Sequence, residues 1–267
     1  MLAAVVCTLL FASQQPIERT PSIFRCTTSE GESKWFAQFL EEEYYDTYCI
    51  EPKPGPIAAK LLKQGKFKTI TAKEIDTPAN LKWRDLTIDF VNGKITPKKW
   101  LTETGKLNAT IHFLSSPKTK TLRVATMEES RRAVFAEMLL TSLPGKLCLT
   151  SNDNGELRYL PDPGRLQSWY LAMRDYLGPM MYYRIKEPYI VTGKMKIVRA
   201  DDKPGLLAYT LAKGNRSLTF HFNNGPAQIE LPNLKMERTT IVRGLDMEGP
   251  QPRLNQFGSV ILDLAGE

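Results

Sequence analysis

The chain has 267 residues, of which 42% are hydrophobic and 24% are charged, so it is long enough to bury one large core or two smaller ones. The net charge of +7 is spread along the chain and is not interleaved with aromatic residues, so we expect no nucleic-acid partner. With two histidines, no Cys-x-x-Cys pair and no glycine-rich phosphate loop, we expect neither a metal site nor a cofactor.

An apolar run opens the chain at Leu2–Ala12. It is shorter than the ~20 residues that a membrane-spanning helix needs, and it has the length of the hydrophobic part of a signal peptide. No basic residue precedes it and Phe11 stands where cleavage prefers a small residue, so a buried first strand or helix is the alternative. We expect a signal peptide over 1–16, no membrane span, and a secreted or periplasmic protein.

Three cysteines remain after the predicted leader: Cys26, Cys49 and Cys148. An oxidising compartment permits disulfides, so Cys26 and Cys49 can pair. That pairing would leave Cys148 free.

Residues 17–186 alternate strand-like and helical patterns, which is typical of an α/β region. Helices are expected from Ser33 to about Tyr48, behind the capping-box pattern at Thr126–Glu129, and over Ser168–Lys186. Strands are expected at four apolar runs, namely Ser22–Thr27, Leu86–Val91, Ala109–Leu114 and Leu147–Leu149.

Residues 187–267 have the pattern of an antiparallel all-β domain, because short apolar runs are separated by Gly, Asn and Pro turns. The expected strands are Met195–Val198, Leu206–Leu211, Leu218–Asn223, Ala227–Leu231 and Ser259–Leu264.

The order and spacing of several motifs resemble the end of an alpha-amylase-family glycoside hydrolase. Arg184, Pro188 and Gly193 are spaced like the arginine, proline and glycine that lead from that family's last barrel helix into its β-domain. Upstream, Ala136–Gly145 looks like the helix and turn before the eighth barrel strand. Three later segments look like strands of the β-domain: Leu206–Tyr209, Phe220–Asn223 and Val260–Leu264.

The resemblance implies a partial (β/α)-barrel-like region, equivalent to the second half of a (β/α)8 barrel, followed by an antiparallel β-sandwich domain. A closed barrel has no edges, whereas part of one exposes two. We therefore expect either an open sheet covered by helices or a homo-oligomer formed through the open sheet edges.

The residues that the family uses for hydrolysis are hard to find. Retaining glycosidases need two carboxylates about 5–5.5 Å apart. The resemblance implies a nucleophile after the fourth strand, a general acid after the fifth and a further aspartate after the seventh. Phe113–Pro117 stands at the seventh position without histidine or aspartate, and no fourth-strand motif is present. If Ile23–Thr27 is the fifth strand, Glu30 and Glu32 are the nearest candidates for a remnant general acid, although exposed loop glutamates are the default interpretation.

Trp169 and Tyr170 are candidate carbohydrate-binding residues because aromatic rings can stack on sugars, although core packing is the more common role at helical spacing. The sequence thus predicts a catalytically degenerate, exported, alpha-amylase-family-like protein that binds α-glucan or another carbohydrate. If it were active, it would be a glycoside hydrolase acting on α-glucans. The alternatives are a truncated gene product and an unrelated exported α+β binding or scaffold protein.

Overall fold

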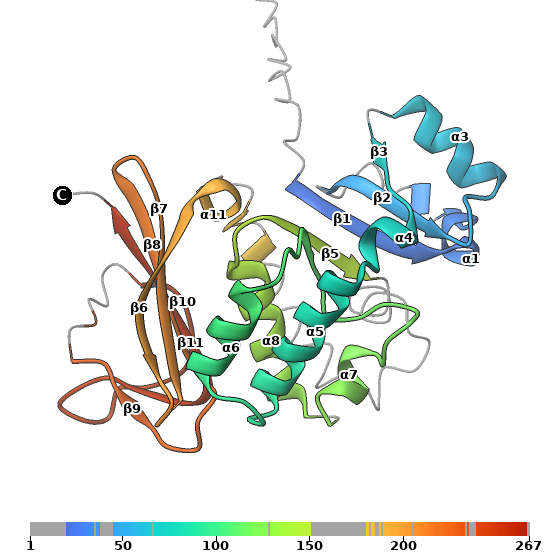
Figure 1. Ribbon diagram of the computed structural model, residues 1–267. Helices are drawn as coiled ribbons and strands as arrows, with labels where there is room; N and C mark the ends of the chain where they lie inside the picture. Colours follow the sequence, from blue (N-terminus) through green and yellow to red (C-terminus); the bar gives the residue numbers. More distant parts are fainter. Residues whose placement is uncertain are drawn as a thin grey trace, which may run out of the picture.

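The computed structural model describes residues 20–34, 36–37, 45–65, 67–127, 129–150, 180–181, 183–184, 187, 189–203, 205–232, 234 and 239–265. The predicted signal peptide over 1–16 lies outside these residues. Figure 1 shows a parallel sheet on one side of the molecule, an antiparallel sheet on the other, and α5, α6 and α8 between them. This arrangement confirms the predicted fold class of a partial barrel-like region followed by an antiparallel β-domain, although the described strands of that domain form one sheet and not the two sheets of the expected sandwich.

The parallel sheet has five strands in the order β3-β2-β1-β5-β4. Every neighbouring pair in it is parallel. The strands are β1 (Thr20–Thr27), β2 (Tyr45–Glu51), β3 (Lys68–Thr69), β4 (Ile111–His112) and β5 (Lys146–Thr150).

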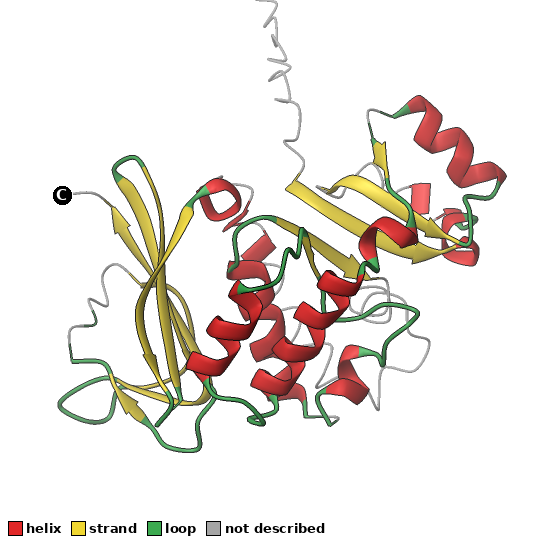
Figure 2. Ribbon diagram, in the orientation of Figure 1, coloured by secondary structure: helices red, strands yellow, loops and turns green. Residues whose placement is uncertain are grey.

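Among the described residues the parallel sheet is open, because β3 and β4 are its edges there and each is only two residues long. Helices join and cover its strands (Figure 2). This agrees with the first of the two expected arrangements, an open sheet covered by helices. The helices are α1 (Thr28–Gly31), α3 (Pro56–Gln64), α4 (Ala72–Ile75), α5 (Pro78–Val91), α6 (Pro97–Gly105), α7 (Leu122–Ala125), α8 (Ser130–Ser142) and α11 (Tyr189–Thr192).

Two of the predicted elements in this region are wrong. Leu86–Val91 is not a strand but the second half of α5, which Thr77 caps through its hydroxyl and which Pro78 opens at the first helical position. This half of α5 is buried almost all round, so its apolar residues mimic the pattern of a buried strand. The helix predicted from Ser33 to Tyr48 does not run through, because Tyr45–Glu51 is strand β2, whose aromatic and β-branched residues favour extended structure.

The capping box predicted at Thr126 does not form. Helix α8 begins at Ser130 with Glu129 as its N-cap, and the Thr126 hydroxyl instead donates to the Leu122 carbonyl at 2.9 Å. The predicted end of this helix at Leu143 is confirmed, and β5 follows it directly.

In the described part of the chain the antiparallel sheet has six strands, with β10, β11, β8, β7 and β6 in that order and β9 paired with β11. They are β6 (Lys194–Asp201), β7 (Leu206–Lys213), β8 (Arg216–Asn223), β9 (Ile229–Glu230), β10 (Thr239–Asp246) and β11 (Arg253–Ala265). All five strands predicted from the sequence are present. Strand β10 was not predicted, and all six strands are hydrogen-bonded into one sheet.

Aromatic packing and polar caps join the helices to the antiparallel sheet. Phe135 of α8 packs edge-on against Phe222 of β8, with ring centroids 5.6 Å apart. Asn224 donates its side-chain amide to the Phe90 carbonyl near the end of α5 at 2.7 Å. Arg184, which the sequence marked as part of the family-like turn, is buried and donates to the carbonyls of Thr141, Leu143 and Gly145. It therefore satisfies the carboxyl-terminal carbonyls of α8 and the turn that follows.

Cys26 and Cys49 are both free and buried, so the disulfide considered for them is absent. In the register of β1 and β2, Cys49 lies opposite Arg25 and Cys26 lies opposite Ile50. Successive residues of a strand point to opposite faces of a sheet, so the two thiols face opposite sides. Cys148 is also free and buried.

Candidate functional site

The carboxyl end of the parallel sheet is the natural place to look for a site, because ligands of α/β proteins bind there. One face of this sheet packs against α5 and α8. The other, which we call the inner face, carries a small apolar cluster formed by Ile23, Cys49, Ile75, Ile111, Phe113 and Cys148. Charged side chains continue this inner face toward the strand ends.

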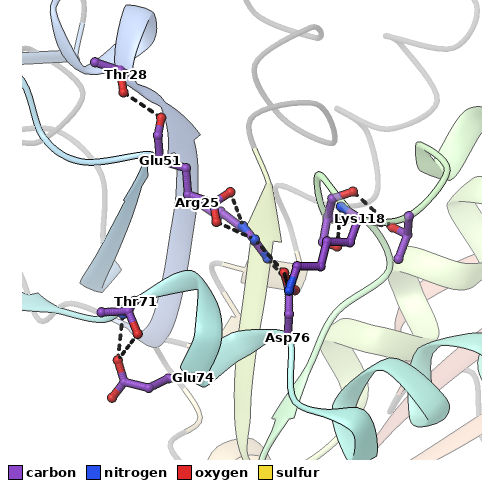
Figure 3. Close-up of polar contacts among 9 residues, drawn as sticks. Arg25, Thr28, Glu51, Thr71, Glu74, Asp76 and Lys118 are labelled. Atoms are coloured by element: carbon purple, nitrogen blue, oxygen red, sulfur yellow. Dashed lines mark hydrogen bonds and ion pairs between the residues drawn. The ribbon is translucent and has the colours of Figure 1, made fainter.

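Arg25, near the end of β1, binds two carboxylates at once (Figure 3). Its guanidinium donates to both oxygens of Glu51, at 3.1 Å from Nε and 2.8 Å from Nη2. It also donates to both oxygens of Asp76, at 2.8 Å from Nη1 and 2.9 Å from Nη2. Paired bonds of this kind exploit the planar fork of arginine and are the strongest type of ion pair.

The charged cluster of Arg25, Glu51 and Asp76, which we call the Arg25 cluster, is largely closed to solvent. The side chains of Arg25 and Asp76 are 2% and 0% exposed, and only Glu51 reaches the surface, at 22%. Lys118 lies in the loop after β4 and places its Nζ 3.7 Å from Asp76 Oδ2, but its side chain is 60% exposed. Two positive and two negative groups therefore lie together at the carboxyl end of the parallel sheet, which we call the mouth of the sheet.

Asp76 reaches this place because α4 lies over the inner face. Ile75, the last residue of α4, is fully buried in the inner-face cluster. A capping box between Thr71 and Glu74 starts α4, with Glu74 accepting from both the amide and the hydroxyl of Thr71. The side chain of Asn80 then holds the end of α4, donating to the Ile75 carbonyl at 2.8 Å and accepting from the Thr110 amide at 2.9 Å. The connection after β3 thus occupies the space in front of the strand ends.

The hydrogen bonds of the Arg25 cluster favour the charged form of Arg25. Burial would lower the pKa of Arg25, but its hydrogen bonds to Asp76 and Glu51 outweigh that effect and raise the pKa above its ordinary value. Burial raises the pKa of Cys49 to about 11, although the charge of Arg25 opposes the shift. A thiol with such a pKa stays protonated at neutral pH and is a poor nucleophile.

The arrangement is poorly suited to acid–base or nucleophilic chemistry. A retaining glycosidase needs one carboxyl group that gives up a proton and another that attacks. Here all four carboxylate oxygens accept from the same guanidinium. Within the described ranges, no group of three or more His, Cys, Asp or Glu side chains is placed to hold a metal ion.

The loop after β4 has a structural role. Ser115 and Ser116 are buried, and Ser115 accepts through its hydroxyl from the Leu122 amide at 3.1 Å. Arg84 donates from Nε to the Leu114 carbonyl at 2.9 Å. This is the segment in which the sequence analysis found no histidine or aspartate, and its polar groups hold the backbone of α7 and the loop itself.

A hollow of about 350 Å³ opens beside Glu51, between the end of β2 and the start of α4. Its wall combines exposed proline rings and threonine hydroxyls with buried and half-buried apolar side chains. The lining residues are Tyr48, Cys49, Ile50, Glu51, Pro52, Lys53, Pro54, Leu62, Thr69, Ile70, Thr71 and Ala72.

The residues singled out from the sequence lie around this mouth or outside the described chain. Glu30 closes a capping box at the start of α1, where its Oε2 accepts from the Thr27 amide at 2.6 Å. Glu32 packs against Gly55, and its Oε1 is buried without a hydrogen-bond partner among the described residues. Trp169 and Tyr170 lie outside the described residues.

Sequence reasoning missed Arg25, Glu51 and Asp76. The signal that was available is the position of Arg25 two residues after Ile23 in a β-prone run, because that spacing places a charge on an apolar face of a strand. A charge in such a place is expected to have a partner. Nothing in the local sequence says that the partners are 26 and 51 residues away.

No protein-family model matches the sequence, and no curated protein matches it. Solved structures do match its fold. A debranching enzyme from Nostoc punctiforme aligns with a TM-score of 0.55 at 13% identity, covering 86% of this chain and 59% of that chain. The chain has an alpha-amylase-family fold.

Two further alpha-amylase-like structures support this statement. A cyclic alpha-maltosyl-(1→6)-maltose hydrolase from Arthrobacter globiformis has a TM-score of 0.55 at 16% identity, with coverage of 86% of this chain and 58% of that chain. An alpha-amylase from H. orenii has a TM-score of 0.53 at 12% identity, with coverage of 87% and 63%. At these identities the similarity is one of fold, and the chain spans about three fifths of the length of the enzymes that it matches.

Proposed function

We propose that this protein is a catalytically inactive relative of the alpha-amylase family that binds α-glucans without hydrolysing them. The observation that carries the proposal is the double ion pair of Arg25. Glu51, at the end of β2, and Asp76, directly after α4, are both held by one guanidinium, and α4 lies over the inner face beside them.

The order of the parallel strands supports the loss of activity. In a closed eight-stranded barrel the last strand pairs with the first. If β5 takes the eighth place, as the resemblance implies, its pairing with β1 gives β1 the first place rather than the fifth. We infer that β1, β2 and β3 correspond to the first three barrel strands, and β4 and β5 to the last two. Three middle strands, which would include those that carry the nucleophile and the general acid, then have no counterpart between β3 and β4.

This placement weakens the case for the two glutamates that the sequence suggested as a remnant general acid. Glu30 and Glu32 would follow the first strand, not the fifth. Glu30 is also engaged in a helix cap. A residual hydrolase built on either of them is therefore the weaker proposal.

Carbohydrate binding is supported by the hollow beside Glu51 and by the nature of the matched proteins. The hollow combines a carboxylate that Arg25 holds in place with hydroxyls and proline rings, a mixture that can contact both the polar edge and the apolar face of a sugar. One matched structure is the Arthrobacter globiformis hydrolase in complex with maltose. Trp169 and Tyr170 remain candidate contacts.

Export is part of the proposal and rests on the apolar run at Leu2–Ala12. Expression of the full chain in a secreting host, followed by N-terminal sequencing of the product, tests it. Cleavage near residue 16 would support export, and an intact N-terminus on a cytosolic product would contradict it. Within the described residues, no helix is long and apolar enough to cross a bilayer.

The decisive experiment is calorimetric titration of the purified protein with maltose, maltoheptaose and soluble starch, with released sugar assayed in the same samples. We expect heat of binding without release, and weaker binding in Trp169→Ala or Tyr170→Ala. Sugar release that disappears in Glu30→Gln or Glu32→Gln would overturn the loss of hydrolysis. The absence of both binding and release would leave the scaffold alternative.

A further inference from the structure

A second cavity lies where α5 and α8 meet the antiparallel sheet, far along the sequence from the Arg25 cluster. It has a volume of about 230 Å³ and receives residues from the α5–α6 connection, α8, the ends of β7 and β8, and β11. Junctions between structural units are favoured places for ligand sites. We call it the junction pocket.

Five planar polar side chains line part of the junction pocket. Asn92, Asn224, Gln256, Asp202 and Arg132 line it, together with the flat rings of Pro97, Pro226 and Phe257. Amides, carboxylates and guanidinium groups can each bind two neighbouring hydroxyls, while a flat apolar ring can contact the C–H face of a sugar. This mixture differs from the mainly apolar lining of most small-molecule sites.

The polar groups are held in place by the surrounding chain. Asn92 donates from Nδ2 to the Ala125 carbonyl at 2.9 Å, and Asn224 donates from Nδ2 to the Phe90 carbonyl at 2.7 Å. Asp202 accepts through Oδ1 from the Lys98 amide at 3.2 Å. Side chains fixed in this way lose little freedom when a ligand arrives.

One acceptor in this set is left unused. Asn92 Oδ1 is buried and has no hydrogen-bond partner among the described residues. A buried acceptor without a donor is uncommon in a folded protein, and a ligand hydroxyl would satisfy it.

Another lining residue, Phe257, has an unusual backbone conformation. Phe257 has a φ of 57°, which is the left-handed region that a bulky residue rarely adopts. The guanidinium of Arg132 lies over its ring, 5.3 Å from the centroid, and ion-pairs with Glu129, with Nε and Oε2 2.9 Å apart but not aligned as a hydrogen bond. Strained residues of this kind are concentrated at ligand sites.

From these observations we propose that the junction pocket binds a single hexose unit of an α-glucan, as a second carbohydrate site separate from the mouth of the parallel sheet. The volume is below the ~300 Å³ at which pockets for drug-sized ligands begin, so it fits one sugar ring rather than a chain. The choice of an α-glucan rests on the proposed function. The site itself rests on the lining, the unused acceptor and the strained residue Phe257.

The test uses maltose and maltoheptaose with the full chain and a matched pair of glutamine variants. Gln256 lines the pocket, whereas Gln228 lies outside it, is exposed, and donates to the Asn255 side chain at 2.7 Å. We expect Gln256→Ala to weaken maltose binding at least fivefold in calorimetry and Gln228→Ala to leave it unchanged. In the wild-type protein, the side-chain amide signals of Asn92 and Gln256 should shift in NMR spectra when maltose is added, which does not depend on a variant that folds.

The outcomes separate this inference from the proposed function. If maltoheptaose binds, but Gln256→Ala binds it as well as wild type and the Asn92 and Gln256 signals do not move, the junction pocket is not a sugar site and the proposed function stands. If neither sugar binds, both proposals fail. Loss of maltose binding in Gln256→Ala together with shifts of those two signals supports the junction pocket.

Discussion

The imidazole of His112 lies stacked on the indole of Trp83, with ring centroids 4.3 Å apart and the planes 28° from parallel. Burial, together with the nearby charge of Arg184, lowers the pKa of His112 to about 4, although a hydrogen bond that the imidazole donates to the Pro144 carbonyl opposes the shift. Burial and the charge of Arg199 likewise lower the pKa of His221 to about 4. Both rings are therefore neutral in the folded protein at neutral pH.

These shifts predict a loss of stability in mild acid. The unfolded chain takes up a proton on each histidine near pH 6.5, whereas the folded protein does so only near pH 4. The stabilising contribution is therefore fully present above about pH 6.5 and is lost as the pH falls from there toward 4. Urea unfolding at a series of pH values should show the free energy of unfolding falling by up to ~3 kcal/mol per histidine across this window. In His221→Gln the fall should be about half as steep, and an unchanged slope would contradict the assignment.

Replacing Arg25 should be strongly destabilising. Arg25→Met leaves the buried Asp76 with only the exposed Lys118 as a positive neighbour, and breaking a buried pair from one side costs about 3–5 kcal/mol. The matched control is Lys106→Met, which removes an exposed pair with Glu103 and should change the free energy of unfolding far less. Adding Asp76→Asn and Glu51→Gln to Arg25→Met should recover part of the loss. Equal effects of Arg25→Met and Lys106→Met in denaturant unfolding would show that the cluster is not a structural clamp.

Replacing Arg184 should change both the stability of the protein and the pKa of His112. Arg184→Met removes three donors from the carbonyls of Thr141, Leu143 and Gly145, which should cost about 2 kcal/mol or more of stability. It also removes the positive charge that lowers the pKa of His112. The His112 pKa measured by NMR should therefore rise in this variant. A stability loss without any rise in that pKa would place the two groups in separate environments.

The cysteines should be inert in the folded protein. Cys26, Cys49 and Cys148 are buried, and burial raises the pKa of Cys26 as well as that of Cys49. A thiol reagent at pH 8 should therefore modify at most Cys7 in the native full-length chain and all four cysteines in denaturant. Thermal unfolding should also be the same with and without reductant, which a structural disulfide would not allow.

The antiparallel sheet was largely predictable because the ends of its strands are marked by local turn residues. Gly205 and Gly214, which both have positive φ, stand at such turns. The parallel region was harder, because its elements are buried on several sides and lose their periodicity. The last half of α5 is the example: Leu86, Thr87, Ile88, Phe90 and Val91 are all buried, so alternation and helical spacing cannot be told apart.

The candidate site was not predictable for a different reason. Arg25, Glu51 and Asp76 come from β1, β2 and the end of α4, and each has an ordinary local context in the sequence. Only the parallel pairing of β1 with β2 and the return of the chain over the inner face bring them together. The absence of a histidine and an aspartate at Phe113–Pro117, by contrast, is readable directly from the sequence.

The position of Ile75 has a consequence for the solution behaviour of the molecule. An open sheet with an uncovered apolar inner face would expose that face to water and would tend to associate with copies of itself. Here the connecting segment after β3 covers the inner face of the sheet, and Ile75 within it is 0% exposed. The edge strands β3 and β4 offer only two residues each for pairing with a strand of another molecule. The described residues thus cover the inner face of the sheet themselves, which leaves little apolar surface there to drive self-association.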